Sequence, residues 1–371
     1  MNMKRFLISG GGTGGHIFPA VAIANRIKRE IPDAEILFIG ADDKMEMRRV
    51  PEAGYNIVGL TIYGISRSLS PKGILRNLKL PFVLMKSMKK AKKTIREFKP
   101  DVAIGVGGFA SGPALKAAAQ LGIPTIIQEQ NSYPGVTNKI LSKTVKSICV
   151  AYEGLEKYFP ADKIVMTGNP VRDEILNMVD RDDNAYQFFG LEKGKKTVLV
   201  VGGSLGARTI NECMAAHIAD IQKLGIQLIW QTGESYYKTI SKELLDLNDP
   251  NIKIVPFIKK MDYAYSVADI IVSRAGALAI SELSIIGKPT VLVPFPYAAE
   301  DHQTKNARAL SDKGAAKLIA DSAAATELYP TLLNLLEDEA GCAEMAENIK
   351  KFARPQAIGK IFEEIMKLAK E

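Results

Sequence analysis

The stretch Gly10-Gly-Gly-Thr-Gly-Gly-His16 follows a short apolar run at 5–9 and precedes a stretch at 17–24 that is typical of a helix start. The order of strand, glycine loop and helix brings backbone N–H groups and the positive end of a helix to one point, where a phosphate can bind. His16 lies at the rim of that point, and histidine is the side chain best suited to accept a proton near neutral pH. The sequence therefore predicts an α/β fold with a phosphate loop and a candidate base.

The same glycines have a simpler interpretation, since a glycine loop after a first strand is often only a tight turn. In that case His16 only caps the helix. The spacing also differs from the dinucleotide fingerprint, which requires an acidic residue about 20 residues later, at the end of the second strand. Here the acidic residues Asp33 and Glu35 fall just before that strand. The pattern argues against NAD binding.

The composition is that of a globular protein with room for two domains. The chain has 371 residues, of which 47% are hydrophobic and 7% aromatic. Its cysteines at 149, 213 and 342 show no CxxC pairing, which predicts neither a disulfide nor a zinc site and suits a reducing cytoplasm. No apolar run approaches the roughly 18 residues of a membrane span, and the N-terminal run is too short for a signal peptide.

The charge is distributed unevenly along the chain. Residues 1–168 hold 25 Lys and Arg against 13 Asp and Glu, although the whole chain has a net charge of only +8. Within this half, Lys72–Lys99 contains ten basic residues and a single acidic one, Glu97. The asymmetry predicts an anionic partner for the N-terminal half, which is either nucleic acid or a membrane surface.

Short apolar runs alternate with helical stretches, which predicts parallel sheets flanked by helices. The expected strands form two series, at 6–9, 35–39, 102–106, 125–128 and 147–150, and at 197–201, 227–231, 252–255, 270–273 and 290–293. Each series opens with a strand that runs into a glycine loop. The turn Gly168-Asn-Pro170 separates them. We therefore expect two doubly wound domains, 1–168 with a returning helix at 353–371, and 169–352.

A basic stretch with an apolar strip lies at 72–86. Ile74, Leu75, Leu78 and Phe82 fall on one helical face, with Arg76, Lys79 and Lys86 nearby. An apolar strip bordered by basic residues suits contact with an anionic lipid surface. It is equally typical of an ordinary helix that buries one side, and the sequence leaves both interpretations open.

Further polar clusters follow other expected strands. In the first domain, 105–113 is a second glycine-dense strand end that we expect to face the loop at Gly10, and 128–138 carries amides and Glu129 suited either to sugar hydroxyls or to turns and caps. In the second domain, the glycine loop at 202–208 offers backbone N–H groups that can bind a diphosphate. Glu282 follows the strand at 270–273, where a carboxylate binds a ribose or complements the helix dipole. His302, Gln303 and Asn306 lie at another loop-to-helix transition.

Taken in order, these motifs resemble the MurG family of bacterial N-acetylglucosaminyltransferases. The matching stretches are GGGTGGH (10–16), GVGGFASGP (105–113), EQNSYPGVTN (129–138), GNPVR (168–172), GGSLGARTIN (202–211), SRAGALAISEL (273–283) and PFPYAAEDHQTKNA (294–307). The resemblance extends from about residue 3 to FARPQA at 352–357. It implies a GT-B fold, two Rossmann-like domains facing across a cleft, with an acceptor and membrane-associated domain first and a nucleotide-sugar domain second.

The resemblance also implies the site. UDP-N-acetylglucosamine would be held by Thr13, Gly14, Gly15, Asn131, Arg172, Ser204, Ile258, Ala277, Leu278, Ala279, Ile280, Ser281, Glu282 and Gln303. In such enzymes Glu282 binds the ribose hydroxyls, the backbone near Ile258 reads uracil, and the loop of Ser204 binds phosphate. Two positions depart from the family pattern, since Gln128 replaces a common histidine and Ala279 a usual threonine.

The implied reaction is an inverting transfer of N-acetylglucosamine to the 4-hydroxyl of undecaprenyl-diphosphate-linked N-acetylmuramoyl-pentapeptide, with His16 as the base. The family implies a peripheral enzyme at the cytoplasmic face of the plasma membrane, on an anionic surface. No DxD-like pair lies near the nucleotide motifs, so we expect no metal ligand from the protein and no cofactor.

Three alternative functions stay open: a non-hydrolysing UDP-N-acetylglucosamine 2-epimerase, a glycolipid synthase acting on diacylglycerol, and a nucleic-acid-binding protein, for which no recognised module is present.

Overall fold

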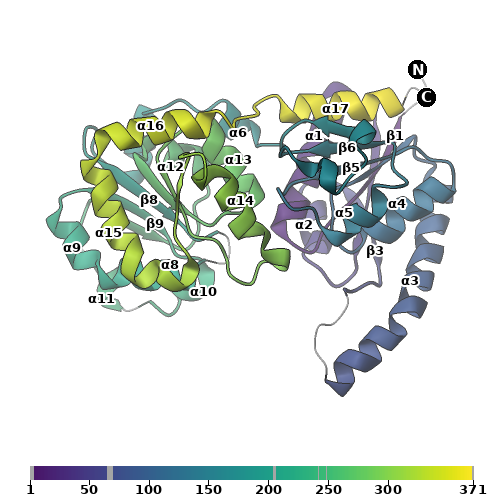
Figure 1. Cartoon of the computed structure of the whole chain (residues 1–371), viewed down its shortest axis with the longest axis horizontal. Helices are drawn as coiled ribbons and strands as arrows, with labels where there is room; N and C mark the ends of the chain where they lie inside the picture. Colours follow the sequence, from purple (N-terminus) through teal and green to yellow (C-terminus); the bar gives the residue numbers. More distant parts are fainter. Residues whose placement is uncertain (1–3, 65–69, 204–205, 241, 248, 370–371) are drawn as a thin grey trace. The chain divides into compact units, whose positions relative to one another are not determined.

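The computed structural model of the chain describes residues 4–64, 70–203, 206–240, 242–247 and 249–369. Within these residues the chain forms two compact units, each built on its own parallel sheet with helices packed against it (Figure 1). The first unit contains the chain up to Val171 and again from Pro355, and the second contains Arg172–Arg354.

The first unit contains a sheet of seven described strands in the order β3-β2-β1-β4-β5-β6-β7, all parallel. Its strands are β1 (Arg5–Ser9), β2 (Glu35–Ala41), β3 (Asn56–Leu60), β4 (Val102–Gly105), β5 (Thr125–Glu129), β6 (Ser147–Val150) and β7 (Ile164–Met166). Its helices are α1 (Gly14–Glu30), α2 (Glu46–Glu52), α3 (Pro71–Phe98), α4 (Ser111–Gln120), α5 (Val136–Leu141) and α17 (Ala357–Leu368).

Alternation along β1 divides the core of this unit into two layers. Phe6 and Ile8 face the layer beneath α1 and α17, whereas Leu7 faces the layer beneath α3 and α4. The apolar residues of α17 recur at helical spacing and join the first layer, and Lys4 Nζ donates to the carbonyl of Ala369 at 2.8 Å. The last helix of the chain thereby completes the core that the first strand begins.

The second unit contains a sheet of six described strands in the order β10-β9-β8-β11-β12-β13, again all parallel. Its strands are β8 (Thr197–Val201), β9 (Gln227–Gln231), β10 (Ile252–Val255), β11 (Ile270–Ser273), β12 (Thr290–Leu292) and β13 (Lys317–Leu318). Its helices are α6 (Asp173–Leu176), α7 (Asp183–Phe189), α8 (Arg208–Ala216), α9 (Ile218–Lys223), α10 (Glu234–Tyr237), α11 (Lys242–Leu245), α12 (Met261–Val267), α13 (Ala277–Ile286), α14 (His302–Ser311), α15 (Ala324–Glu337) and α16 (Glu339–Lys350).

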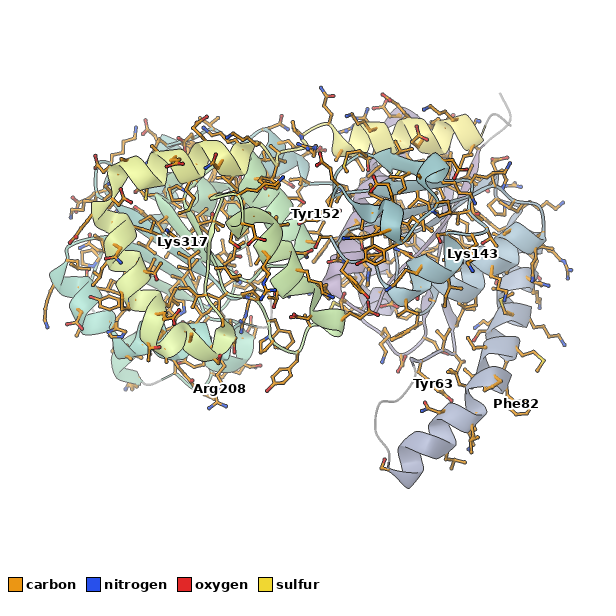
Figure 2. All side chains as sticks on the ribbon, viewed as in Figure 1. Tyr63, Phe82, Lys143, Tyr152, Arg208 and Lys317 are labelled. Atoms are coloured by element: carbon orange, nitrogen blue, oxygen red, sulfur yellow. The ribbon has the colours of Figure 1, made fainter. Side chains whose placement is uncertain are left out.

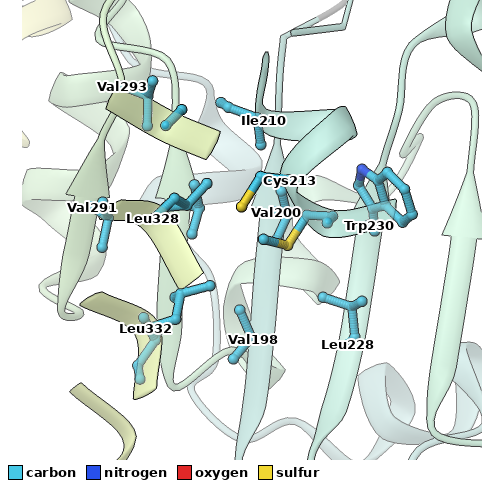
Figure 3. Packing of buried hydrophobic residues seen from close by; sticks show 14 of the residues in the cluster. Val198, Val200, Ile210, Cys213, Leu228, Trp230, Val291, Val293, Leu328 and Leu332 are labelled. Carbon is cyan, nitrogen blue, oxygen red and sulfur yellow. The ribbon is translucent and has the colours of Figure 1, made fainter. Parts of the chain in front are cut away.

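The core of the second unit lies between β8, β9 and the helices α8 and α15 (Figure 3). Val198 and Val200 of β8 lie beside Leu228 and Trp230 of β9 in this layer. The Trp230 indole is fully buried, and its Nε1–H donates to Asn211 Oδ1 at 3.0 Å, so its polar atom is satisfied.

In each unit the strand order reverses beside the first strand, because β1 lies between β2 and β4 and β8 lies between β9 and β11. Ligands of open α/β sheets bind at such a switch point, outside the carboxyl ends of the strands. The predicted fold class is confirmed: all ten predicted strands are present, with ends shifted by at most two residues. In the part of the chain that the structure describes, no helix combines the length and apolar character needed to cross a bilayer.

Candidate functional site

The glycine loop between β1 and α1 ends at Thr13, the N-cap of the helix. The Thr13 carbonyl accepts the N–H groups of His16 and Ile17, both at 3.1 Å, so α1 is wound from its first turn. Gly12 has a φ of +89°, a conformation that a glycine adopts without steric cost. Thr13 and Gly15 are exposed and Gly14 is half-buried, so the start of α1 is accessible to a ligand.

His16 lies in the first turn of α1 and is half-buried. Its Nδ1 lies 3.0 Å from the carbonyl oxygen of Gly11. A carbonyl oxygen only accepts, so Nδ1 carries the hydrogen and Nε2 carries the lone pair of the neutral ring. This tautomer makes Nε2 the atom that can act as a base.

The loop after β4 packs directly on the first glycine loop, which confirms the expected contact between them. A Cβ on Gly107 would lie 2.9 Å from His16 Nε2 and Cδ2, and a Cβ on Gly108 would lie 2.3 Å from the Gly11 carbonyl oxygen. Both glycines have a positive φ, near +90°. These positions need glycine for two reasons, the backbone conformation and the close approach.

Glu129 holds the loop that follows β5. Its Oε1 accepts the backbone N–H and the Nδ2 of Asn131, at 3.0 and 3.2 Å. Its Oε2 accepts the N–H of Gly135 at 3.1 Å and Nδ2 of Asn138 at 2.8 Å. The turn-and-cap interpretation of Glu129 is therefore correct, and this carboxylate orients Asn131.

Two amides connect the β5 loop to its neighbours. Gln130 Nε2 donates to the carbonyl of Val106 at 3.0 Å, which ties the loop to the end of β4. Gln128 is 1% exposed and donates to Asn169 Oδ1 at 2.8 Å. Gln128 thus belongs to a buried amide network, and Asn131 lies at the same edge of the sheet as His16.

In the second unit, the glycine loop between β8 and α8 is closed against the end of β9. Gly203 and Gly206 have positive φ, and a Cβ on Gly206 would lie 2.1 Å from the carbonyl oxygen of Thr232. The predicted phosphate ligand Ser204 lies outside the described residues. Arg208, which begins α8, is exposed (Figure 2). It pairs with Glu212 at 2.6 Å.

Gln231 at the end of β9 joins two of these loops, and no sequence motif includes it. Its Nε2 donates to the carbonyl of Gly203 at 3.0 Å, and its Oε1 accepts the N–H of Ile258 at 2.9 Å. The side chain is 3% exposed. The Gln231 amide therefore occupies the N–H of Ile258 in this structure.

The run Ala277 to Glu282 forms the first turns of α13, directly after β11. Ala277, Leu278 and Ala279 are half-buried, Ile280 is buried, and Ser281 Oγ donates to the carbonyl of Ala277 at 3.0 Å. Gly276 is the N-cap and has extended backbone. The helix therefore begins at the carboxyl edge of the sheet, where a ligand of the second unit is expected.

Glu282 is a buried carboxylate of this unit that contacts two other side chains. Arg172 donates to its Oε1 from Nε and Nη2, both at 2.9 Å, and the Tyr265 hydroxyl donates to Oε2 at 3.2 Å. Burial raises the pKa of Glu282, and Arg172 and Tyr265 oppose that rise. The carboxylate is held in one orientation by a cation and a phenol.

Gln303 lies in the first turn of α14, which follows β12. Its Oε1 accepts the N–H of Phe295 at 2.9 Å, so it fixes the loop between β12 and α14. Its Nε2 is the end that can donate to a ligand. The predicted residues thus form two groups: 13–16 with Asn131 at the carboxyl edge of the first sheet, and Arg172, Ile258, 277–282 and Gln303 at that of the second.

Two doubly wound units, each with a glycine loop at its switch point, are the domains of a GT-B-type fold. The chain belongs to glycosyltransferase family 28: the N-terminal domain of that family matches residues 6–150 and the C-terminal domain matches residues 197–361.

Individual relatives agree with this assignment. The chain is 54% identical over 368 residues, 99% of both chains, to the UDP-N-acetylglucosamine--N-acetylmuramyl-(pentapeptide) pyrophosphoryl-undecaprenol N-acetylglucosamine transferase of Parabacteroides distasonis. It is similar to the crystal structure of MurG from Acinetobacter baumannii, with a TM-score of 0.78 and 33% identity over 98% of this chain and 99% of that one. The UDP-GlcNAc 2-epimerase of Neisseria meningitidis, bound to UDP-GlcNAc, shares only the fold, with a TM-score of 0.67 and 16% identity over 98% of this chain and all of that one.

Proposed function

We propose that this chain transfers N-acetylglucosamine from UDP-N-acetylglucosamine to the 4-hydroxyl of undecaprenyl-diphosphate-linked N-acetylmuramoyl-pentapeptide (lipid I), which forms lipid II for peptidoglycan synthesis. The observation that carries the proposal is the 54% identity over nearly the full length of both chains to a relative with this named activity. The glycine loops of this chain lie at the carboxyl edges of two sheets, where α/β folds bind ligands.

The second unit is proposed to bind most of the donor. Glu282 accepts hydrogen bonds from the ribose hydroxyls, Gln303 Nε2 donates to the sugar nucleotide, and the loop at 202–207 with the start of α8 binds the diphosphate. Arg172 keeps Glu282 oriented for this contact. Thr13, Gly14, Gly15 and Asn131 of the first unit are proposed to contribute the remaining donor contacts.

His16 is proposed as the base of an inverting displacement. Its Nε2 takes the proton from the acceptor hydroxyl as that oxygen attacks the anomeric carbon, and UDP leaves with the bonding electron pair. The Nδ1–H contact to Gly11 supports this role, because it leaves the lone pair on Nε2. General base catalysis of this kind contributes typically about 10²–10⁴-fold to a rate.

The first half of α3 is proposed to contact an anionic membrane at the cytoplasmic face. Leu75, Leu78, Phe82 and Met85, here called the α3 strip, are 53–72% exposed, so the interpretation of this face as ordinary core is wrong. The side chains of Ile74 and Arg76 lie outside the described part of the chain. Lys79 and Lys86 are exposed beside the strip, whereas the second half of the helix packs on α4 (Figures 1 and 2). Apolar residues bordered by lysines bind anionic lipid surfaces.

The proposed function is tested by offering the purified protein UDP-N-acetylglucosamine with a short-chain lipid I analogue. We expect UDP release that depends on the analogue, and a product one N-acetylglucosamine heavier by mass spectrometry. Diacylglycerol replaces the analogue in a parallel reaction and is expected to give no product. A changed sugar nucleotide without an acceptor would indicate epimerase activity and contradict the proposal.

A further inference from the structure

Glu46 is a buried carboxylate beside the first glycine loop. It begins α2 and is 1% exposed. Its Oε2 accepts the N–H of Gly12 at 2.8 Å, and its Oε1 accepts the N–H of Ala41, at the end of β2, at 3.0 Å. No motif in the sequence includes it, and the donor and acceptor contacts proposed above do not use it.

The loop is shaped to admit this side chain. A Cβ on Gly11 would lie 2.1 Å from Glu46 Oε1, and a Cβ on Gly40 would lie 2.5 Å from Glu46 Cγ. Real Cβ atoms do not approach other atoms so closely, so any larger residue at Gly11 or Gly40 would push the carboxylate away. These two glycines make room for Glu46 between β2 and the loop.

Glu46 and His16 hold the two ends of one peptide group. The N–H of Gly12, which Glu46 accepts, and the C=O of Gly11, which accepts His16 Nδ1–H at 3.0 Å, belong to the same planar unit. Hydrogen bonds in such a chain polarise one another. A carboxylate at the N–H end therefore makes the carbonyl a stronger acceptor for the imidazole.

The peptide group has little freedom to turn away. Gly108 packs against the Gly11 carbonyl from the β4 side, and Gly107 packs against the His16 ring. The ring therefore lies against the backbone of two glycines, Gly11 and Gly107. The Glu46 carboxylate contacts the N–H end of the same peptide group, not the ring itself.

We propose that Glu46 is a positioning residue for His16, acting through the Gly11–Gly12 peptide group. It fixes the carbonyl that holds Nδ1–H, keeps the lone pair on Nε2, and strengthens the ring as a base. In serine proteases a carboxylate contacts the imidazole directly, whereas here a peptide group stands between the two. The inference rests on the proposed role of His16 as the base.

Nuclear magnetic resonance of the full chain tests the arrangement without any substrate. The sequence has three histidines, at 16, 217 and 302, so the ring of His16 can be assigned by substitution. We expect the Nδ1–H tautomer in the wild type. In Glu46→Gln the pKa of His16 should fall by about half a unit, the equivalent of a weakened hydrogen bond. Glu52→Gln, at the exposed end of the same helix, should leave it unchanged.

Kinetics separate positioning from a merely structural role. Glu46→Gln should lower kcat about tenfold, keep the KM for UDP-N-acetylglucosamine within about twofold, and move the acid limb of the kcat–pH profile to lower pH. When His16 is already replaced by Ala, Glu46→Gln should cause no further decrease in kcat. Thermal unfolding of each variant checks that the fold is retained.

The outcomes distinguish the two proposals. Normal turnover of His16→Ala would overturn the proposed function of His16 itself. If His16→Ala lowers kcat and the double variant lowers it further by the factor seen for Glu46→Gln alone, only the role of Glu46 would be overturned. The Nε2–H tautomer in the wild type, or equal His16 pKa values in Glu46→Gln and Glu52→Gln, would also overturn it.

Discussion

Arg172 and Glu282 are 110 residues apart in the chain, yet two nitrogens of the guanidinium lie 2.9 Å from the same carboxylate oxygen. Arg172 is the first residue of the second unit, and Glu282 lies in the helix after its fourth strand. Tyr265 binds the other carboxylate oxygen from α12. Three separate segments therefore fix one carboxylate at the carboxyl edge of the sheet.

Glu282→Gln should weaken donor binding. The amide keeps one accepting oxygen, but it loses the charge that pairs with Arg172 and binds hydroxyls strongly. We expect the KM for UDP-N-acetylglucosamine to rise about tenfold, and the free energy of unfolding to fall by about 1–2 kcal/mol. Steady-state kinetics and urea denaturation measure the two effects.

Glu174→Gln is the matched control for that substitution. Glu174 is an exposed carboxylate on α6 that also acts electrostatically on Arg172. Removing its charge should leave the KM for UDP-N-acetylglucosamine and the free energy of unfolding nearly unchanged, because exposed charge pairs contribute little to stability. Equal effects of the two substitutions would contradict a specific role for Glu282 in donor binding.

His16→Ala should reduce kcat by about 10²–10⁴-fold while the donor still binds, because the ring is proposed to act on the acceptor hydroxyl. Isothermal titration with UDP-N-acetylglucosamine measures binding, and UDP release measures turnover. His217→Ala is the control, since His217 stacks on Tyr329 in the second unit and has no proposed part in the reaction. A variant that loses donor binding together with turnover would indicate a binding role instead.

Gly107→Ala should displace the His16 ring. The new Cβ would lie 2.9 Å from the ring, and the residue would keep a φ of +93°. We expect kcat to fall about tenfold or more, because a small displacement of a base is costly.

Gly122→Ala separates the backbone effect from the contact with the ring. Gly122 has a φ of +77° and nothing within 4 Å of its Cβ position. Both variants should lose about 1 kcal/mol of stability, seen as a lower melting temperature, but only Gly107→Ala should lose turnover. Full activity of Gly107→Ala would show that His16 tolerates movement.

Reversing the charge of three exposed lysines near the α3 strip should weaken membrane binding. The triple substitution of Lys79, Lys86 and Lys89 to Glu is expected to move the protein away from phosphatidylglycerol vesicles in a sedimentation assay. A second triple substitution, of the exposed Lys223, Lys238 and Lys351 in the other unit, changes the net charge equally and should leave sedimentation unaltered. The same sedimentation for both triple variants would argue against the α3 strip as the contact.

Lys288 should make the stability of the second unit depend on pH. Burial lowers the pKa of Lys288, whose Nζ donates to the carbonyls of Ser266 and Ala268 and pairs with Asp180 at 2.7 Å. In the unfolded chain a lysine keeps its proton up to about pH 10.5. Between the lowered pKa and pH 10.5 the unfolded state binds more protons, so a rise in pH favours folding in this window.

The measurement compares urea unfolding of the wild type and Lys288→Met between pH 7 and pH 10. The stability of the wild type relative to the variant should increase with pH. Lys317→Met, at an exposed position (Figure 2), controls for general effects of alkaline pH. A difference that stays constant with pH would contradict the lowered pKa.

Most strands that the sequence predicts, such as β8 and β11, contain continuous apolar runs, which parallel sheets need because both faces are buried. Three further strands give a weaker signal. β3 is partly exposed and contains Gly59, β7 has three half-buried residues, and β13 has only two residues. All three lie at or next to sheet edges, where burial places weaker demands on the sequence.

The motif residues of the candidate site can be predicted because glycine loops at strand ends have a recognisable order. The residues that hold those loops in place cannot be predicted from the sequence. Glu46 lies 34 residues from Gly12, and Gln231 lies 28 residues from Gly203 and 27 from Ile258. Only the pairing of β1 with β2, and of β8 with β9, brings each to its loop. Their side chains act through the backbone, so no local spacing marks them.

The position of α17 has a consequence for synthesis on the ribosome. The apolar layer over β1, which α1 covers only in part, is not complete until residues 357–368 have emerged, whereas the second unit has been translated by then. The second unit, which is continuous in the chain, is therefore able to fold first. The first unit, whose synthesis starts earliest, is completed last. Until then Phe6, Ile8 and the apolar residues around them form a surface that chaperones can bind.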